Sequence, residues 1–549
     1  MSNLPLLLII LPTFASFLIL LSEHFSRIQA LSKIIALVAT AGTLFLILLS
    51  TPLIFKGEIL TYELGGWKEP LGISLKMDGL AYLACLIGII IGLFVLIYAY
   101  NEENYSPKFY FFFLLLLGGM QGVILTNDLF NMFVFFEILS IASYILITYS
   151  REVRALRASL NYLLISSLGM SLFLLGIGFI YQECGVLSLS GIGKAFISKK
   201  GIFPSAFYLA IPLLVVGVGV KAAFIPLHTW LPDAHAYAPT PVSAILSGVM
   251  IKVSFLALWR IIYILQTFTI QYLLIWIGAF TALLPVIWAL SQSDLKKLLA
   301  YHSVSQMGFI IASFGVGSSL SLTASFYHII NHSLFKSLLF LSVGAVIYTA
   351  GARDINELSG LYKRMPGIAF ACGIGALSIS GMPPLNGFVS KNLISLSLNS
   401  YPLPALLIFL ASIGTVASFT KLLSIFWGKP SGRSNIRRIP KSMTLPLFIL
   451  CGLCLLLGIF PSRAISTISH LILSKELSFP IQIYSFSSLW MSLWILVLGV
   501  LLYRLITSEE GQRISSRIKQ TRPGLSNSLC LIMIALIAIV MLSHILPGG

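Results

Sequence analysis

The stretch VGVGVKAAFIPLHTWLPDAHAYAPTPVSAILSGVMIKVSFLALW, residues 216–259, places Lys221 and Lys252 in apolar segments on either side of a polar, proline-rich break. A charged residue at bilayer depth costs about 2.5–3.5 kcal/mol on insertion scales, so we interpret each lysine as functional. Irregular backbone is tolerated at that depth only where protein or a water-filled cavity covers it. The stretch therefore predicts ion or proton passage through a helical bundle.

The composition indicates a polytopic membrane protein. The 549 residues are 58% hydrophobic and 10% charged, with a mean hydropathy of +0.97, whereas soluble domains carry about 25% charged residues. The net charge of +17 is interpreted as topogenic, because no nucleic-acid-binding motif accompanies it. Cys451 and Cys454 form a CxxC without a second ligand pair, and no haem, flavin or iron–sulfur motif occurs. We expect no cofactor, no metal and no nucleic-acid partner for this chain.

Apolar runs predict an all-α protein with sixteen membrane spans. The first run lacks a preceding basic segment and a following A-x-A site, so we interpret it as a retained helix. The predicted spans occupy residues 4–21, 31–53, 77–100, 109–126, 129–149, 158–181, 206–227, 239–260, 269–290, 297–314, 320–349, 366–395, 403–427, 443–461, 483–503 and 527–546.

Two of these spans contain proline and glycine breaks. FIPLHTWLP follows Lys221, and SGMPPLNGFVSK leads into Lys391. Paired discontinuous helices in two halves are typical of inverted repeats with a site at mid-membrane. The predicted organisation is helices 1–3 in residues 1–108, repeats over 109–260 and 269–427, and C-terminal helices in 428–549 with a short linker at 504–526.

Basic residues predict the orientation in the membrane. Loops after odd-numbered spans hold 21 of the 30 Lys and Arg that lie outside span centres. The positive-inside rule places these loops, including 429–441, in the cytoplasm. Both termini are then predicted to lie outside a multi-pass cell membrane protein, and the prokaryotic plasma membrane is the expected location.

Among the 18 Asp and Glu, only Glu137 lies near the middle of a predicted span. A buried carboxylate is unfavourable without a nearby cation, and Lys221 is the natural candidate. We predict a Glu137–Lys221 pair whose opening lets the lysine release a proton, because desolvation disfavours its charged form. A static ion pair that only fixes helix packing is the alternative.

Histidines extend this polar line. His328 and His332 are spaced i, i+4 in SFYHIINHSLFKSLLF, and Lys336 continues the same helix face. Imidazole donates and accepts hydrogen bonds, so the stripe suits a water-linked proton relay. A zinc site and ordinary core histidines are the alternatives. His228 and His235 flank the break after Lys221 and are candidate links to water.

Five stretches together resemble one family. They are FFEILSIASY (135–144), KAAFIPLHTWLPDAHAYAPTPVSAILSGVMIK (221–252), SDLKKLLAYHSVSQMGFI (293–310), YHIINHSLFKSLLFLSVGAV (327–346) and SGMPPLNGFVSK (380–391). They resemble the antiporter-like subunits shared by respiratory complex I, Mrp-type Na⁺/H⁺ antiporters and membrane-bound hydrogenases. The resemblance implies a 14-helix core with two inverted five-helix repeats and a polar axis at mid-membrane.

The resemblance also implies roles along that axis. Glu137 and Lys221 are expected to form the input pair and Lys252 the bridge between halves, with Lys391 as the outlet lysine. His328 and His332 are expected to continue the axis. Lys421, in the span that matches that of Lys252, is either a second bridging lysine or a residue at a packing edge.

Departures from the pattern narrow the assignment. Lys391 stands where one complex I subunit has glutamate, and 504–526 is too short for that complex's long lateral helix. The matching stretches most resemble those of D-type Mrp subunits and their hydrogenase counterparts. Compared with these subunits, the chain has about two extra C-terminal helices.

The expected function is that of a non-redox, proton-translocating subunit of a multisubunit redox-driven pump. A subunit of an Mrp-type Na⁺/H⁺ antiporter and a structural membrane scaffold are the alternatives. The expected partners are other membrane subunits, the lipid bilayer and protons, with Na⁺ as the other candidate ion.

Overall fold

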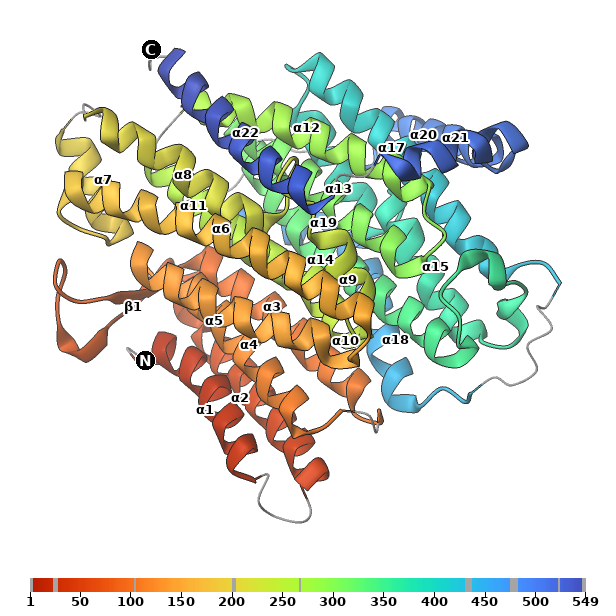
Figure 1. Cartoon of the computed structure of the whole chain (residues 1–549), viewed down its shortest axis with the longest axis horizontal. Coiled ribbons are helices and arrows are strands. Elements are labelled where there is room, and N and C mark those ends of the chain that lie inside the picture. Colours follow the sequence, from red (N-terminus) through yellow and green to blue (C-terminus); the bar gives the residue numbers. More distant parts are fainter. Residues whose placement is uncertain are drawn as a thin grey trace.

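The chain folds into a helical bundle with one small β-hairpin (Figure 1). The computed structural model describes residues 3–22, 28–102, 105–199, 204–265, 268–429, 437–473, 482–521 and 524–545. The helices before the first break are α1 (Leu4–Ser22), α2 (Ile28–Phe55), α3 (Gly79–Ala99), α4 (Pro107–Leu125), α5 (Leu129–Ile147), α6 (Val153–Cys184), α7 (Leu189–Ser198) and α8 (Ser205–Ala222).

The remaining helices surround the two breaks and form the C-terminal part. They are α9 (Leu231–Tyr237), α10 (Thr240–Ile245), α11 (Ile251–Leu265), α12 (Phe268–Leu290), α13 (Leu295–Val316), α14 (Ser319–Ala350), α15 (Pro366–Ser380), α16 (Asn386–Ser397), α17 (Pro402–Leu423), α18 (Lys441–Ile459), α19 (Pro461–Leu473), α20 (Phe486–Thr507), α21 (Glu509–Gln520) and α22 (Leu525–Ile545).

Twelve helices of the described chain are long and apolar enough to cross a membrane, and each coincides with a predicted span. The other four predicted spans are also helical. Two of them, 206–227 and 366–395, contain the breaks, which leaves the shorter apolar helices Phe207–Ala222 and Pro366–Ser380. The third, α13, carries Lys296, Lys297 and His302 among its apolar residues, and the fourth holds the short apolar stretch Asn527–Ala538. The predicted fold class is confirmed.

Strands β1 (Leu60–Glu63) and β2 (Ser74–Met77) pair antiparallel between α2 and α3. The hairpin is held to the bundle by Glu69, whose carboxylate accepts hydrogen bonds from Asn127 Nδ2 at 3.0 Å and Ser190 Oγ at 2.9 Å. The hairpin is therefore joined to the α4–α5 connection and to the start of α7.

Small residues let neighbouring helices approach closely, as is common in membrane bundles. A Cβ on Gly278 of α12 would lie 2.2 Å from the Ala312 nitrogen of α13, and a Cβ on Gly308 of α13 would lie 2.2 Å from Ala282 N. Only glycine fits at these two positions. The contact fixes α13, which carries several of the buried polar side chains described below.

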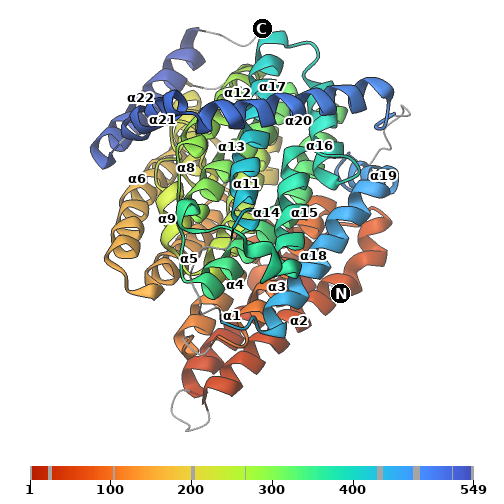
Figure 2. The same cartoon turned by 90° about the vertical axis from the view of Figure 1, so that its right-hand side faces the viewer.

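The C-terminal helices lie along the outside of the bundle (Figure 2). Helix α20 packs on α17, α21 contacts α12, and α22 packs against α8 and α6. The three helices α20 to α22 therefore extend from the second predicted half of the chain to the first. The boundaries of the two repeats, 109–260 and 269–427, stay a prediction.

Candidate functional site

The first break opens the main chain directly after Lys221. Helix α8 ends at Ala222, and Ala223 adopts a left-handed conformation with φ 56°. Trp230 Nε1 donates to Val220 O at 2.8 Å, and Ile225 N donates to Thr281 Oγ1 at 3.0 Å. Because an unsatisfied backbone group is costly in hydrocarbon, these bonds allow the break to exist within the bundle.

Lys221 is fully buried in this region. Its ammonium donates to Ser140 Oγ, and it lies 5.3 Å from the ring centroid of Tyr162 and 5.9 Å from that of Tyr144. No ion pair within 4.0 Å joins Lys221 to Glu137, which lies one turn before Ser140 on α5 and is half-buried. The charge of Glu137 nevertheless acts on Lys221, and the Glu137–Lys221 pair stays a prediction.

His235 follows on α9 and is fully buried. Its ring centroid lies 6.0 Å from that of Trp230 and 6.3 Å from that of Phe340. Neither ring nitrogen has a hydrogen-bond partner within the described chain. The nearby cations that act on the ring are Lys252, Lys296 and Lys336. His235 therefore lies near the lysines of α11, α13 and α14.

His228 occupies the break itself, where its ring stacks on that of Trp288 with centroids 5.5 Å apart. Beyond it, Asp233 pairs with Lys297 at 2.9 Å in the first turn of α9. These two contacts hold the segment between α8 and α9 against α12 and α13.

Lys252 lies just beyond a π-helical turn, Leu246–Met250, that joins α10 to α11. Its ammonium donates to Ser247 O, and the Ser247 hydroxyl bonds Ser303 Oγ of α13 at 2.7 Å. Turns of this kind are frequent at functional sites. Here the turn links Lys252 to α13 through Ser247 and Ser303.

The predicted stripe on α14 is present and fully buried. The rings of His328 and His332 are nearly parallel, at 15°, with centroids 6.1 Å apart. Lys336 Nζ donates to Leu299 O at 2.6 Å. His328 also bonds Ser390 Oγ through Nδ1 at 2.9 Å, so α14 is linked directly to α16.

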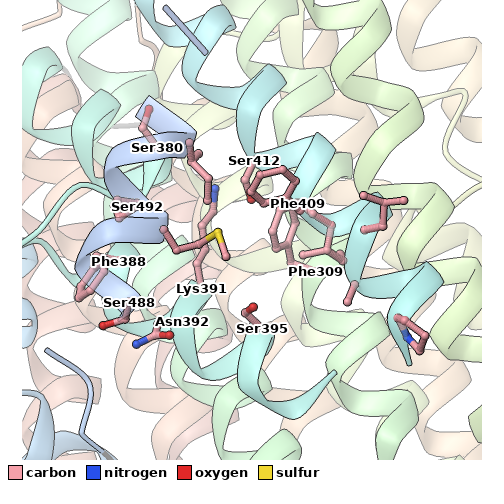
Figure 3. A pocket seen from close by; sticks show the side chains of 17 residues that line it. Phe309, Ser380, Phe388, Lys391, Asn392, Ser395, Phe409, Ser412, Ser488 and Ser492 are labelled. Carbon is pink, nitrogen blue, oxygen red and sulfur yellow. The ribbon is translucent and has the colours of Figure 1, made fainter. Parts of the chain in front are cut away.

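The second break precedes Lys391. Helix α15 ends at Ser380, Gly381 has φ 81°, and α16 begins at Asn386. Lys391 Nζ lies 4.9 Å from the centroid of the Phe309 ring, is covered, and has no hydrogen-bond partner among the described residues. Beside it lies a cavity of about 380 Å³ (Figure 3). Lys391 therefore faces a sizeable empty space.

Lys421 lies apart from these residues. Its Nζ donates to Leu290 O and Gln292 O, both at 2.9 Å, at the carboxyl end of α12. A lysine is favourable there, because the last carbonyls of a helix lack partners within it. This contact matches the packing-edge interpretation, and the bridging role stays a prediction.

Two buried residues of α13 were missed by the sequence interpretation. Lys296 Nζ donates to Ala238 O at the end of α9. His302 is fully buried, with its ring 4.9 Å from that of Phe419 and both nitrogens without a hydrogen-bond partner within the described chain. The sequence did contain a signal for His302, because His302 and Gln306 are spaced i, i+4 and therefore share one face of the helix. Gln306 on that face contacts His328 Nε2 at 3.1 Å.

Buried lysines and histidines thus run through the bundle from one break to the other. In the described chain, no group of three or more His, Cys, Asp and Glu is arranged to hold a metal ion. The members of the series, from first break to second, are the buried residues Lys221, His235, Lys252, Lys336, His332 and His328, and then Lys391, which is half-buried with its Nζ covered.

Comparison with known proteins agrees with this arrangement. Residues 126–420 match the protein family described as NADH:quinone oxidoreductase/Mrp antiporter, TM. The chain belongs to this family. The matched region contains both breaks and every residue of the buried series, so the resemblance noted from the sequence is confirmed.

Relatives within the family match nearly their whole length. The N-type subunit of the NADH-quinone oxidoreductase of Desulforudis audaxviator (strain MP104C) is 34% identical over 499 residues, covering 85% of this chain and 98% of its own. The D-type subunit of the Na⁺/H⁺ antiporter of Alkalihalophilus pseudofirmus is 32% identical over 477 residues, covering 83% of this chain and 94% of its own. The chain is therefore an antiporter-like membrane subunit.

Solved structures share the fold. A chain of the membrane-bound sulfane sulfur reductase, an archaeal respiratory membrane complex, aligns with a TM-score of 0.79 and 27% identity, covering 90% of this chain and 100% of its own. A chain of the Mrp complex from Dietzia sp. DQ12-45-1b aligns with a TM-score of 0.78 and 23% identity, covering 89% and 99%. Both neighbours are subunits of multisubunit membrane complexes.

Proposed function

We propose that this chain translocates protons as one subunit of a multisubunit, redox-driven ion pump. The observation that carries the proposal is the buried series from Lys221 to Lys391, which continues from one helix break to the other. Lysine and histidine can each take up and release a proton, and buried charges are expensive unless they serve a function. The chain contains no motif for a redox group, so partner subunits are proposed to supply the energy.

The proposed pathway begins near Glu137 and passes Lys221 through Ser140. It continues through His235 to Lys252 and Lys336, and then along α14 to the second break. His228 and Lys421 are retained as predicted members, with His228 linking the first break to water. Each step moves a proton between groups that can hold it, and intervening waters complete the gaps.

The chain is proposed to lie in the cell membrane with both termini outside. The lipid bilayer and neighbouring membrane subunits of the complex are its proposed surroundings, in keeping with the complexes that contain its structural neighbours. A structural scaffold needs none of the buried lysines, because well-packed apolar residues are usually at least as stabilising as buried charges.

The test uses inverted membrane vesicles that contain the assembled complex. Acidification of the lumen is followed with a pH-sensitive dye while an electron donor is added. The proposal expects acidification in the parent and loss of it in Lys252→Ala at unchanged assembly. Normal acidification in that variant would contradict the proposed pathway.

A subunit of an Mrp-type antiporter is the second candidate, favoured by the relatives that are named as D-type subunits of Na⁺/H⁺ antiporters. The same vesicles distinguish the two functions. An antiporter releases a preformed pH gradient when Na⁺ is added and needs no electron donor, whereas a redox-driven pump builds the gradient only with the donor.

A further inference from the structure

The cavity beside Lys391 has a mainly apolar wall, to which α13, α16, α17 and α20 contribute. Figure 3 shows Phe309 of α13 and Phe409 of α17 on one side of Lys391, and Ser492 of α20 on the other. The apolar side chains of the wall include Phe309, Phe388, Leu406, Phe409, Met491 and Ile495. Helix α20 lies beyond the 14-helix core that the resemblance implies, so the C-terminal extension of the chain completes this cavity.

Lys391 is the charged residue of the wall, and the described residues of the lining include no acidic one. Its Nζ is covered and has no hydrogen-bond partner within the described chain. A buried ammonium is strongly unfavourable unless it is paired and hydrogen-bonded. The cavity therefore combines an apolar wall with a cation that lacks a negatively charged partner.

Hydroxyl groups of the wall do not supply donors for an anion. Three serines already donate to main-chain oxygens: Ser492 Oγ to Gly381 O at 2.9 Å, Ser488 Oγ to Ile483 O at 2.7 Å, and Ser412 Oγ to Ile408 O at 3.0 Å. A serine has one O–H donor, whereas an ammonium has three N–H donors. An anion in this cavity would therefore be held chiefly by Lys391.

The cavity opens between α17 and α20, both of which are long and apolar enough to cross a membrane. Leu406 of α17 and Met491 of α20 line it and are 49% and 52% exposed. Asn392 Nδ2 donates to Ile483 O at 2.9 Å and holds the segment before α20 against α16. Because the opening lies between two membrane-crossing helices and carries apolar side chains, a ligand that enters there comes from the lipid.

The size and chemistry of the cavity fit a fatty acid. Its volume of about 380 Å³ lies within the roughly 300–1,000 Å³ of ligand pockets, which are mostly apolar with a few orienting polar groups. A fatty acid ends in a small carboxylate, so its head can reach Lys391 while its chain leaves through the opening. A phospholipid phosphate lies between a headgroup and two chains, which are too bulky to enter beside a covered Nζ.

We propose that this cavity binds the carboxyl end of a long-chain fatty acid from the surrounding bilayer, with the carboxylate paired to Lys391 Nζ. A protonated acid and a neutral lysine form this pair when the acid transfers its proton to the amine, so the entering molecule carries no net charge. Hydrogen bonds between ammonium and carboxylate are about twice as strong as neutral ones. Binding is inferred from the cavity alone.

The consequence for transport rests on the proposed function. A nearby carboxylate favours the charged form of a lysine, so a lysine paired with a fatty acid holds its proton more tightly. A bound fatty acid should therefore slow the release of protons by Lys391. Through α20, the chain would then respond to free fatty acid in the membrane.

The first test measures binding by photo-crosslinking. A palmitic acid analogue with a diazirine in its chain is added to the assembled complex in phosphatidylcholine nanodiscs, and labelled peptides are mapped by mass spectrometry. Labelling is expected on α17 and α20 near Leu406 and Met491. Lys391→Met removes the ammonium and keeps an unbranched side chain, so it should reduce this labelling at least about tenfold. Lys363→Met, a change at an exposed lysine, should leave it unchanged.

Two further arms guard the interpretation. Ala405→Phe keeps Lys391 and fills part of the cavity, because Ala405 belongs to the lining, so the acid probe should lose its labelling in this variant as well. The matching alcohol probe, which has no charge, should label the parent at least about tenfold less.

Equal labelling by the alcohol probe, or by the acid probe in the assembled Lys391→Met or Ala405→Phe complex, would overturn the inference. Absence of labelling near Leu406 and Met491 in the parent would do the same. Stronger labelling by a phosphatidylglycerol probe would identify a phospholipid as the occupant and would also contradict it.

The second test concerns transport. Palmitate is added to the vesicles, and each acidification rate is divided by the rate of the same complex without palmitate. Palmitate carries protons through lipid by itself, so the parent and Ala405→Phe are compared in the same lipid, where this leak is equal. The parent should be inhibited at about tenfold lower palmitate concentration. Equal inhibition would overturn the consequence for transport, whereas no transport by the parent without palmitate would contradict the proposed function instead.

Discussion

Asn331 and Asn386 exchange hydrogen bonds across the second break. Asn386 Nδ2 donates to Asn331 Oδ1 at 3.1 Å, and Asn331 Nδ2 donates to Asn386 O at 3.0 Å. The pair joins the first residue of α16 to the middle of α14, between His328 and His332. The break that leads to Lys391 is thereby fixed to the helix that carries the histidines.

Asn331→Leu should destabilise the protein and slow proton transport. The change keeps the branched shape of the side chain, although leucine is larger, and it leaves the buried Asn386 amide without its partner, which costs about 1–3 kcal/mol. Thermal unfolding of the purified complex and transport in vesicles provide the measurements. Ser333→Ala is the control on the same helix, because the Ser333 hydroxyl is buried without a hydrogen-bond partner within the described chain. Equal losses in both variants would contradict the interpretation.

Glu137→Gln and Lys221→Ala should each reduce proton transport by at least about tenfold, as expected for loss of a proton-transfer group, while the complex still assembles. Ser140→Ala should give an intermediate loss, because the Ser140 hydroxyl accepts from Lys221. The exposed carboxylate Glu58 supplies the control variant Glu58→Gln. Near-normal transport in the Glu137 or Lys221 variant would remove the pair from the pathway.

Lys391→Arg and Lys391→Ala should both impair transport. Arginine keeps the positive charge, but its guanidinium does not release a proton under these conditions. Vesicle acidification is measured alongside assembly, with Lys441→Ala, a change at an exposed lysine, as the control. Full activity of the arginine variant would show that a fixed charge is sufficient.

Cysteine labelling tests the orientation. A reporter at Ser434 should be protected from an impermeant reagent added outside, and a reporter at Gly548 should react, because of the 21-to-9 distribution of Lys and Arg. Both positions lie outside the described residues. The reverse labelling pattern would exchange the proposed input and exit sides.

Glu102→Gln should change the pH dependence of stability. Glu102 lies in the connection after α3, and burial raises the pKa of its carboxyl above the ordinary 4.5, partly opposed by a hydrogen bond with Tyr105. The folded protein then binds this proton more tightly than the unfolded chain, so the unfolding free energy falls as pH rises from about 4.5 through the raised pKa.

In the glutamine variant this fall should be absent, and the protein should be more stable than the parent above that pH range. Tm measured over the same pH series in detergent checks the result. Parallel curves for parent and variant would indicate that Glu102 does not titrate differently in the folded state.

Local sequence predicted much of the fold and of the site. Hydrophobic runs located the spans, proline and glycine located both breaks, and the i, i+4 spacing located the stripe from His328 to Lys336. These features depend on neighbours in the chain, so periodicity and turn chemistry report them directly.

Contacts between distant segments could not be predicted in this way. The hydrogen bond from Lys221 to Ser140 depends on how α5 and α8 lie against each other, which no local pattern specifies. The Lys391 cavity likewise needs α17 and α20 side by side. Lys296 was overlooked because it follows Asp294 at a helix start, where a basic pair is typical of a solvated turn.

The π-helical turn at Leu246–Met250 has a consequence for how the gene tolerates changes in length. Each π turn contains one residue more than an α turn, so loss of a single codon within it would leave α10 and α11 in their orientations. Loss of a codon within α10 would instead rotate Lys252 by about 100° relative to Thr240, because an α-helix has 3.6 residues per turn. Deletions a few codons apart should therefore differ sharply in their effect on proton transport.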